Sequence, residues 1–393
     1  MSVVENPVRT VGIVGAGAMG RGIADVCLRA GLQVRLRDVN AAVACETVLA
    51  LQQQTAHPEF ADRIAVARDD AGLADAELLI EAVPEKLELK KAILEQLEAV
   101  LPDSAVLASN SSSLSITELS TALKVPQRFC GLHFCHPVSE RPLVEVIGAR
   151  LTSQDTLNQA FAFATLLGMA PVIVPDSPGF LLNRLIVPYL NEALELLLDG
   201  ADVESLDRAA KEFGMSRGPL VLFDDFGVDV ALAVGRSLYM AFPDRISPSE
   251  MLIAMYKSRR LGRKSGGGFY ADQAAANAGR VDPEVVRLIH ERRRTDVRLP
   301  DDQVAQRLFL PMLLEATRTL HDGLASSAAV IDHALQNGLG MSVRYRGLFG
   351  WANTVGPNML LQWLQSLQNI GPRFEPTDML RHAVESGQPL GAG

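Results

Sequence analysis

Apolar segments and helical patterns alternate along residues 10–175. Short segments rich in Val, Ile and Leu predict strands at Thr10–Val14, Gln33–Asp38, Ile64–Ala67, Leu78–Val83, Ala105–Ala108, Phe129–Phe134, Leu143–Ile147 and Pro171–Val174. Apolar residues at helical spacing lie in Lys86–Val100 and Gln154–Leu167. This alternation predicts a mostly parallel sheet that helices cover on both faces. The later strands follow one another without long helices, so we expect part of the sheet to be antiparallel.

The pattern changes at Val174–Gly179, where two prolines and a glycine predict a linker. Beyond it, helical spacing continues almost throughout and contains an internal repeat. Four segments recur in the same order: Arg184–Ala193 as Arg307–Ala316, Asp199–Gly200 as Asp322–Gly323, Gly214–Ser216 as Gly340–Ser342, and Pro248–Leu252 as Pro376–Leu380. We therefore predict an α/β domain over residues 1–176, then two copies of one all-α domain over 177–275 and 290–393, joined by the polar segment Gln273–Pro300.

A glycine-rich turn connects the first predicted strand to the helical segment Ile23–Ala30. Its pattern is Gly15-x-Gly17-x-x-Gly20, with Met19 inside it. The first glycine suits a sharp turn, the second lets backbone approach a pyrophosphate, and the third lets the helix pack against the strand. The helix N-terminus adds free N–H groups and a positive dipole end. The pattern predicts a Rossmann-like dinucleotide-binding domain.

Asp38 ends the second predicted strand, where a carboxylate accepts hydrogen bonds from the adenosine ribose hydroxyls. Because it would repel a 2′-phosphate, we expect NAD rather than NADP. Arg35 and Arg37 lie beside it, and a guanidinium there could hold such a phosphate, so NADP stays open at this stage.

Composition narrows the class of protein. The 393 residues include 46 acidic and 37 basic side chains, and the net charge of −9 argues against general nucleic-acid binding. The four cysteines show no paired metal-ligand spacing, so we expect reduced thiols in a cytoplasmic protein and no metal. The segment Met1–Thr10 is too polar for a signal peptide, and charges interrupt every apolar run before membrane-spanning length. These features predict a soluble protein without a membrane partner.

Six motifs together resemble those of the 3-hydroxyacyl-CoA dehydrogenases. They are Gly15–Gly20, Ile80–Glu85, Asn110–Ile116, Gly131–Phe134, Leu143–Val146 and Asp176–Arg184. The resemblance covers nearly the whole chain, and the tandem helical domains resemble the dehydrogenase half of multifunctional fatty-acid oxidation proteins. It implies an NAD-dependent oxidoreductase that interconverts a 3-hydroxyacyl thioester and its 3-oxoacyl form. The favoured substrate is 3-hydroxyacyl-CoA, and fatty-acid β-oxidation is one pathway that the resemblance suggests.

Oxidation of such an alcohol needs a base, donors for the developing oxyanion, and a nicotinamide within hydride reach. By resemblance, His133 is the base and Glu145 pairs with its far nitrogen. An imidazole titrates near neutrality, and the carboxylate would fix its tautomer and stabilise the imidazolium. Ser112 and Asn183 match positions that hydrogen-bond the substrate oxygen, a role that a hydroxyl and an amide suit.

Three further residues match cofactor contacts of the family. By resemblance, Glu85 and Lys90 contact the cofactor ribose, and Asn110 belongs to the cofactor pocket. The complete expected NAD site comprises Gly15, Gly17, Met19, Gly20, Asp38, Glu85, Lys90 and Asn110.

The chain departs from the family after His133. Where the family usually has Phe-Asn-Pro, this chain has Cys135-His136-Pro137. The missing Asn ordinarily helps to bind the substrate, so we expect His136 to contact the substrate and the acyl group stays open. A short polar hydroxyacyl unit would suit the added imidazole, and similar relatives in polyketide pathways oxidise a glyceryl unit on acyl carrier protein. CoA and carrier protein both present phosphopantetheine, so the catalytic residues do not distinguish them.

Two expectations concern activity and assembly. A non-catalytic NAD-binding protein is a further alternative, which the retained His133, Glu145, Ser112 and Asn183 argue against. Short members of the family pair through their single helical domain. We expect the second copy to replace that partner, which would give a monomer with one active site, while higher assembly stays open.

Overall fold

The computed structural model describes residues 8–54, 57–272, 276, 280–295, 299–342, 344 and 346–391. Most of the polar N-terminal segment and parts of the predicted Gln273–Pro300 connection lie outside the described residues. The backbone forms two compact units, Met1–Phe180 and Leu181–Gly393. Among the described residues, none of the helices combines the length and apolar character that a bilayer span requires.

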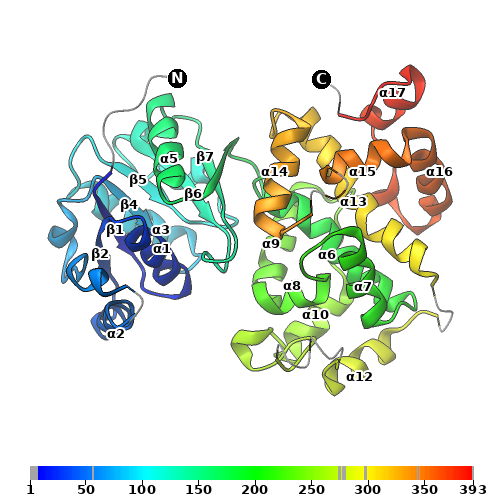
Figure 1. The fold of residues 1–393 in the computed structure, drawn as a ribbon, viewed down its shortest axis with the longest axis horizontal. Helices are drawn as coiled ribbons and strands as arrows, with labels where there is room; N and C mark the ends of the chain where they lie inside the picture. Colours follow the sequence, from blue (N-terminus) through cyan, green and yellow to red (C-terminus); the bar gives the residue numbers. More distant parts are fainter. Residues whose placement is uncertain are drawn as a thin grey trace. The chain divides into compact units, whose positions relative to one another are not determined.

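The first unit is built on an eight-stranded sheet (Figure 1). Its elements are β1 Thr10–Val14, α1 Ala18–Arg29, β2 Gln33–Arg37, α2 Ala41–Gln52, β3 Ile64–Val66, β4 Leu78–Glu81, α3 Leu87–Glu98, β5 Val106–Ser109, α4 Ile116–Ser120, β6 Phe129–Phe134, β7 Leu143–Gly148, α5 Gln154–Leu166 and β8 Ala170–Pro175. The strand order is β3-β2-β1-β4-β5-β6-β7-β8. Neighbours from β3 to β6 are parallel, β7 is antiparallel to β6, and β8 is parallel to β7. The predicted α/β class and its partly antiparallel sheet are confirmed.

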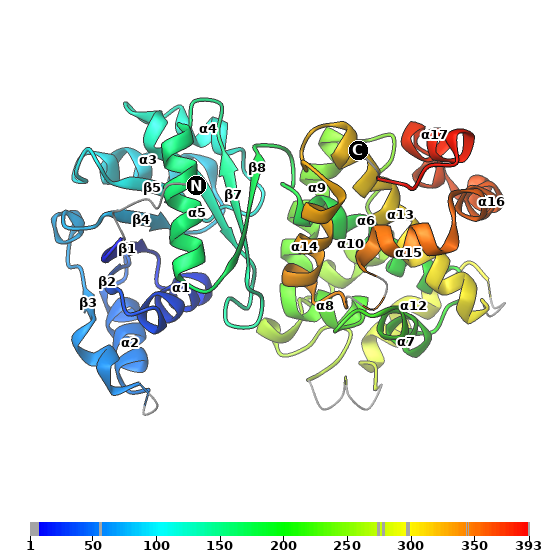
Figure 2. The ribbon, with the colours of Figure 1, turned by 45° about the horizontal axis from the view of Figure 1, so that its top comes forward.

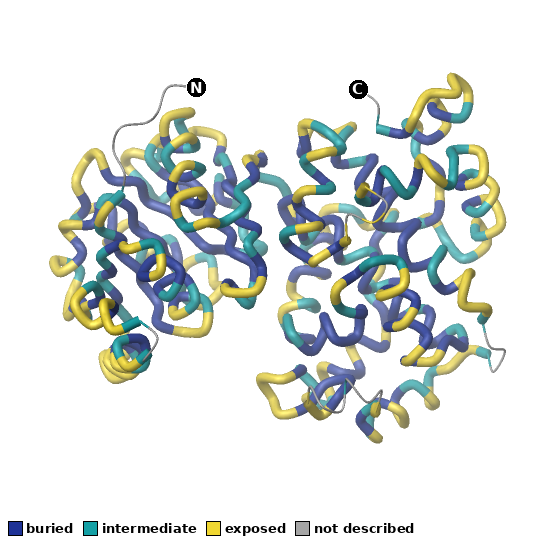
Figure 3. The backbone as a smooth tube through the Cα atoms, viewed as in Figure 1, coloured by how far each residue is buried: buried dark blue, intermediate teal, exposed yellow. Residues whose placement is uncertain are grey.

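Alternation of side chains along β6 assigns its residues to the two faces of the sheet. Cys130, Leu132 and Phe134 belong to a buried core that includes residues of α1, α2 and α5. Gly131 points to the other face, where a side chain in its place would meet Ile116 of α4. His133 shares that second face with Gly131. Figure 2 shows α1 and α5 over the first face, and Figure 3 shows the buried strands between the layers.

The second unit is helical (Figure 1). Its helices are α6 Leu182–Leu198, α7 Val203–Phe213, α8 Pro219–Phe226, α9 Val228–Ala241, α10 Glu250–Lys257, α12 Pro283–Arg292, α13 Asp301–His321, α14 Ala328–Leu339, α15 Gly347–Val355, α16 Pro357–Leu367 and α17 Asp378–Ser386. The described part of the polar connection contains α12, which Asp282 caps through the amide of Glu284. The repeated segments fall on corresponding helices, with α6 to α10 followed in the same order by α13 to α17.

Matched helix ends show why the repeated sequences fold alike. Asp202 caps α7 by accepting a hydrogen bond from the amide of Ser205, and Ser327 caps α14 in the same way through Val330. Both helices end at a glycine in the left-handed region, the usual helix-terminating conformation. The backbones that follow pair with each other, since Ser216 N donates to Gly340 O at 3.2 Å and Ser342 N donates to Gly214 O at 2.7 Å.

Reciprocal ion pairs bind the two copies of the repeat. Arg184 Nε donates to Glu315 Oε1 at 2.7 Å, and the equivalent Arg307 Nε donates to Glu192 Oε1 at 2.7 Å. Both guanidinium groups also reach an aspartate at the end of the opposite helix, Asp322 and Asp199 respectively. Such reciprocity, in which residue i contacts j and the equivalent of j contacts the equivalent of i, is the hallmark of a two-fold interface.

Candidate active site

The pairing of β6 with β7 determines the geometry of the proposed base. The antiparallel register sets His133 directly opposite Glu145, so both side chains emerge on the same face of the sheet. His133 Nδ1 lies 2.7 Å from Glu145 Oε2, and both side chains are buried. A slip of one residue in this pairing would send one side chain to the other face. The structure therefore brings together the two residues that the sequence proposes as partners.

Asn110 and Ser112 follow β5, next to β6. Asn110 Oδ1 accepts a hydrogen bond from the amide of Phe134 at 2.9 Å, so this side chain ties the end of β5 to the strand that carries His133. The amide of Ser112 donates to Glu85 Oε1 at 2.9 Å. The same carboxylate oxygen accepts from the amide of Ser113 and from the hydroxyls of Ser111 and Ser113. Glu85 thus holds the Ser111–Ser113 loop.

Lys90 is buried beneath this loop rather than exposed on α3. Its side chain is 1 % exposed, and Nζ donates to Glu81 Oε1 at 2.7 Å and to the carbonyl of Val83 at 3.1 Å. The ammonium also lies 3.4 Å from Glu85 Oε2. Glu81 in turn accepts a hydrogen bond from Ser109 Oγ at 2.6 Å. The predicted ribose contact of Lys90 stays a prediction, and the observed contacts make it the cation of a buried polar network.

The charge of Glu85 is maintained by this network. Burial raises the pKa of Glu85, but the Lys90 ammonium and hydrogen bonds from Ser111 and Ser113 act more strongly in total, so its pKa is lowered. Glu85 is therefore an anion at neutral pH, which lets it accept several hydrogen bonds from the serine loop. Glu81 lies in the motif Ile80–Glu85, but the sequence analysis did not predict that its carboxylate would accept hydrogen bonds from both Lys90 and Ser109. A glutamate at the end of the apolar segment Leu78–Ile80 was the available signal, because a buried charge requires a partner.

The glycine-rich loop after β1 fits a dinucleotide. Gly15 has φ 108°, and a Cβ on Gly20 would overlap the carbonyl oxygen of Gly15. A Cβ on Gly17, by contrast, would meet no atom within 4 Å, so open space lies over the exposed residue that caps α1. Met19 lies in the first turn of that helix. The space and the helix N-terminus suit a pyrophosphate.

Asp38 lies after β2, where a ribose would bind. Its carboxylate accepts hydrogen bonds from the amides of Ala16 and Asn40, at 2.8 and 2.9 Å, one on each oxygen. Each oxygen keeps a further lone pair for a hydroxyl. Arg35 pairs with Asp75 at 2.9 Å and Arg37 pairs with Asp70 at 3.0 Å, so both guanidinium groups have carboxylate partners. These contacts favour NAD.

Two residues at the dinucleotide loop were not predicted. Val39 is fully exposed beside Asp38, an apolar surface of the kind on which an adenine packs. Thr47 of α2 donates its hydroxyl to the carbonyl of Ala16 at 3.2 Å and so supports the loop. An apolar side chain directly after the acid that is expected to bind the ribose was a signal for Val39. Nothing local marks Thr47, because its partner lies in a different element.

The turn between β6 and β7 carries the residues in which the chain departs from the family that it resembles. Burial raises the pKa of the Cys135 thiol well above its ordinary value, with Glu145 adding to the shift and Arg141 opposing it. Cys135 is therefore a protonated, apolar side chain rather than a nucleophile. His136 is half-buried in the same turn. Asn183 belongs to the other unit, as the second residue of α6.

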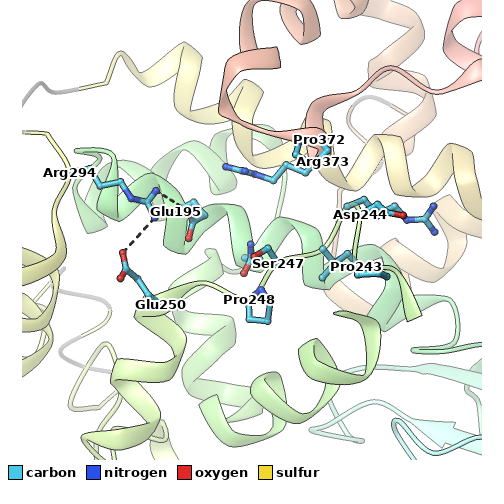
Figure 4. Close-up of a pocket in the computed structure, with 12 residues that line it drawn as sticks. Glu195, Pro243, Asp244, Ser247, Pro248, Glu250, Arg294, Pro372 and Arg373 are labelled. Carbon is cyan, nitrogen blue, oxygen red and sulfur yellow. Dashed lines mark hydrogen bonds and ion pairs between the residues drawn. The ribbon is translucent and has the colours of Figure 1, made fainter. Parts of the chain in front are cut away.

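The helical unit contains a separate polar pocket of about 280 Å³ (Figure 4). Both copies line it, the first through Ser247 and Pro248 and the second through Arg373. Its arginines have carboxylate partners, as for Arg294, which lies 2.8 Å from Glu195. Among the described residues that line the pocket there is no histidine, cysteine, lysine or tyrosine. The His133–Glu145 pair lies in the first unit.

Two domains of one known family together match most of the chain. The NAD-binding domain of 3-hydroxyacyl-CoA dehydrogenase matches residues 10–177, and the C-terminal domain of the same enzymes matches residues 179–272 and 304–391. The structure of 3-hydroxybutyryl-CoA dehydrogenase from Escherichia coli K12 is 27% identical with a TM-score of 0.81, and the match covers 97% of this chain and 100% of that one.

Two further solved structures are similar. The (S)-3-hydroxybutyryl-CoA dehydrogenase PaaH1 from Ralstonia eutropha is 35% identical with a TM-score of 0.62, over 66% of this chain and 98% of that one. The dehydrogenase part of multifunctional enzyme 1 from C. elegans is 25% identical with a TM-score of 0.69, over 96% of this chain and 90% of that one. These matches favour an NAD-dependent enzyme over a non-catalytic NAD-binding protein. With a dinucleotide loop, a helical half and these matches all in agreement, the chain belongs to the 3-hydroxyacyl-CoA dehydrogenase family and is an NAD-dependent oxidoreductase.

Proposed function

We propose that the chain interconverts a 3-hydroxyacyl-CoA and its 3-oxoacyl form, with His133 as general base and Glu145 as its partner. The observation that carries this proposal is the 2.7 Å contact between His133 Nδ1 and Glu145 Oε2. A buried carboxylate on one ring nitrogen orients the imidazole and leaves Nε2 to exchange a proton with the substrate. The two family matches support the same reaction class.

Each step in the oxidation direction is assigned to a residue of the chain. His133 Nε2 takes the proton from the substrate hydroxyl, and Glu145 stabilises the resulting imidazolium. Ser112 and Asn183 donate hydrogen bonds to the substrate oxygen as it becomes a carbonyl. A bound NAD would supply the hydride acceptor for this oxidation. Asp38 would hold the adenosine ribose of NAD, while Glu85 positions the Ser112 loop and Asn110 ties the end of β5 to β6.

Substitution of the pair tests the assignment. In the reduction of acetoacetyl-CoA by NADH, His133→Ala should lower kcat by about 10³-fold and Glu145→Gln by about 10²-fold, with little change in KM for NADH. His382→Ala, an exposed histidine on α17, serves as the matched control and should retain wild-type kcat. A His133→Ala enzyme with wild-type turnover would rule out the proposed base.

A second candidate substrate is a short polar hydroxyacyl unit on acyl carrier protein, such as a glyceryl unit. It is favoured by the β6–β7 turn, where His136 is half-buried and Arg141 is buried close enough to Cys135 to affect its pKa. The test compares turnover of acetoacetyl-CoA with that of a glyceryl-loaded carrier protein. Rapid NADH consumption with the first and none with the second would exclude this candidate. His136→Asn should improve turnover of plain 3-hydroxyacyl-CoA, and no gain would make His136 a neutral replacement.

The chain is further proposed to work as a cytoplasmic monomer with one active site. The reciprocal pairs of Arg184 with Glu315 and Arg307 with Glu192 support this, because they satisfy a two-fold interface within one chain. Light scattering should give the mass of a single chain, about 42.4 kDa. An obligate dimer across dilution would contradict the proposal.

A further inference from the structure

Phe180 has an unusual backbone conformation. Its φ is 49°, in the left-handed region, and its side chain is 1 % exposed. A bulky aromatic residue is rarely found there, because its Cβ crowds the following carbonyl. Such strain persists only where the surrounding structure imposes it, and it concentrates at functional sites. The conformation of Phe180 therefore needs an explanation in terms of what its ring contacts.

The segment that leads to Phe180 is fixed at both ends. Asp176 Oδ2 accepts hydrogen bonds from Ser115 Oγ at 2.6 Å and from the amide of Thr117 at 2.8 Å, at the start of α4. A turn then closes with Phe180 N donating to Ser177 O at 2.9 Å. Asp176 thus anchors the segment to α4, on the face of the sheet from which His133 emerges. The turn delivers Phe180 to that face.

The ring of Phe180 packs against the imidazole of His133. Their centroids are 5.7 Å apart and their planes are inclined by 52°, a tilted geometry that aromatic pairs favour. Glu145 holds Nδ1 of the same imidazole. One partner therefore fixes a ring atom and the other covers the ring, so that together they restrict both rotation of the imidazole and access of water to it.

We propose that Phe180 is a positioning residue for His133. Its ring limits the rotation of the imidazole and shields it from water, and the strained backbone is the cost of bringing a large ring to this place. The proposal rests on the proposed role of His133 as base. Leucine would fill much of the same apolar space without a flat ring, so the ring itself is tested by Phe180→Leu.

The matched control is Phe163→Leu. Phe163 of α5 is 2 % exposed and lies in the core on the opposite face of the sheet. Its substitution makes the same change of side chain in the same unit, away from His133. Two measurements are made on the full chain: steady-state reduction of acetoacetyl-CoA by NADH, and the rate at which diethylpyrocarbonate modifies His133, followed by peptide mass spectrometry. The second reports access to the imidazole directly, which loss of stability alone in the folded enzyme would not change.

For Phe180→Leu we expect kcat to fall by about tenfold with KM for NADH within about twofold. Modification of His133 should accelerate on the order of fivefold, because the ring no longer excludes the reagent. Phe163→Leu should leave kcat and the modification rate of the folded enzyme near wild type. Equal kcat and equal modification rates in the two variants would overturn the role of Phe180 alone. Wild-type turnover by His133→Ala would instead overturn the proposed function.

Discussion

Removal of the Lys90 ammonium tests the buried network beneath the serine loop. In Lys90→Met the apolar stem is kept and the charge is lost, which leaves Glu81 fully buried without a cation. Breaking a buried pair in this way typically costs about 3–5 kcal/mol. Glu81 keeps hydrogen bonds from the amide of Val83 and the hydroxyl of Ser109, so we expect the lower end, about 3 kcal/mol.

The assay separates the two units of the chain. Both tryptophans, Trp351 and Trp363, lie in the helical unit, so their fluorescence follows that unit while far-ultraviolet circular dichroism follows both. For a unit of the size of Met1–Phe180, each kcal/mol of lost stability should lower the Tm by about 2–4 °C. Lys90→Met should therefore lower the Tm of the first unit, identified as the transition that added NAD shifts, by roughly 6–12 °C. The fluorescence transition should stay near that of the wild type.

Lys91→Met is the control one residue along α3. Lys91 lies 3.7 Å from Glu118 and both are partly exposed, so the change should cost less than about 0.5 kcal/mol. Adding Glu81→Gln to Lys90→Met removes both charges and should recover at least about half of the loss. The reasoning fails if Lys90→Met shifts the transition no more than Lys91→Met does.

Three further predictions concern the cofactor site and the helical unit. Asp38→Ser should raise KM for NAD by about tenfold and reduce the ratio of kcat/KM for NAD to that for NADP. An unchanged ratio in steady-state kinetics would count against the assigned ribose contact. Burial raises the pKa of Asp224 from 3.8 to about 6, so the folded state binds a proton that the unfolded state releases, and stability should fall as pH rises from about 4 to above 6. In urea titrations, Asp224→Asn should reduce the change of the free energy of unfolding with pH. An equally large change in the variant would mean that another group causes it. Arg307→Met removes one guanidinium partner of the buried Glu192 and leaves Arg373, so it should lower the free energy of unfolding seen by tryptophan fluorescence by up to about 3 kcal/mol, with an unshifted midpoint as the contrary result.

Much of the fold was predictable because its signals are local. Two strands have the predicted bounds, β1 at Thr10–Val14 and β6 at Phe129–Phe134. Apolar runs between turn residues indicate such strands directly. The glycine-rich loop and Asp38 were equally clear, because the spacing of the motif reflects the connection of one strand to one helix. The family followed from such motifs taken together.

The partners of charged side chains were less predictable. Lys90 sits among charged residues on α3, and nothing in the local sequence shows that its ammonium is buried against Glu81. Helical periodicity places a residue on a face of its helix, but the neighbouring strand decides whether that face meets water or a carboxylate. Glu85 likewise binds the Ser111–Ser113 loop, which lies more than twenty residues further along the chain.

The amino-acid sequence by itself determined which segments become strands and helices, where the dinucleotide loop lies, and which imidazole and carboxylate are candidates for catalysis. Only the tertiary structure decided that His133 and Glu145 face each other, through the antiparallel register of β6 and β7. It also decided the left-handed conformation of Phe180 and its packing on that imidazole. The physical reason is that periodicity and turn chemistry act over a few residues, whereas register, burial of charge and backbone strain are set by contacts between distant segments.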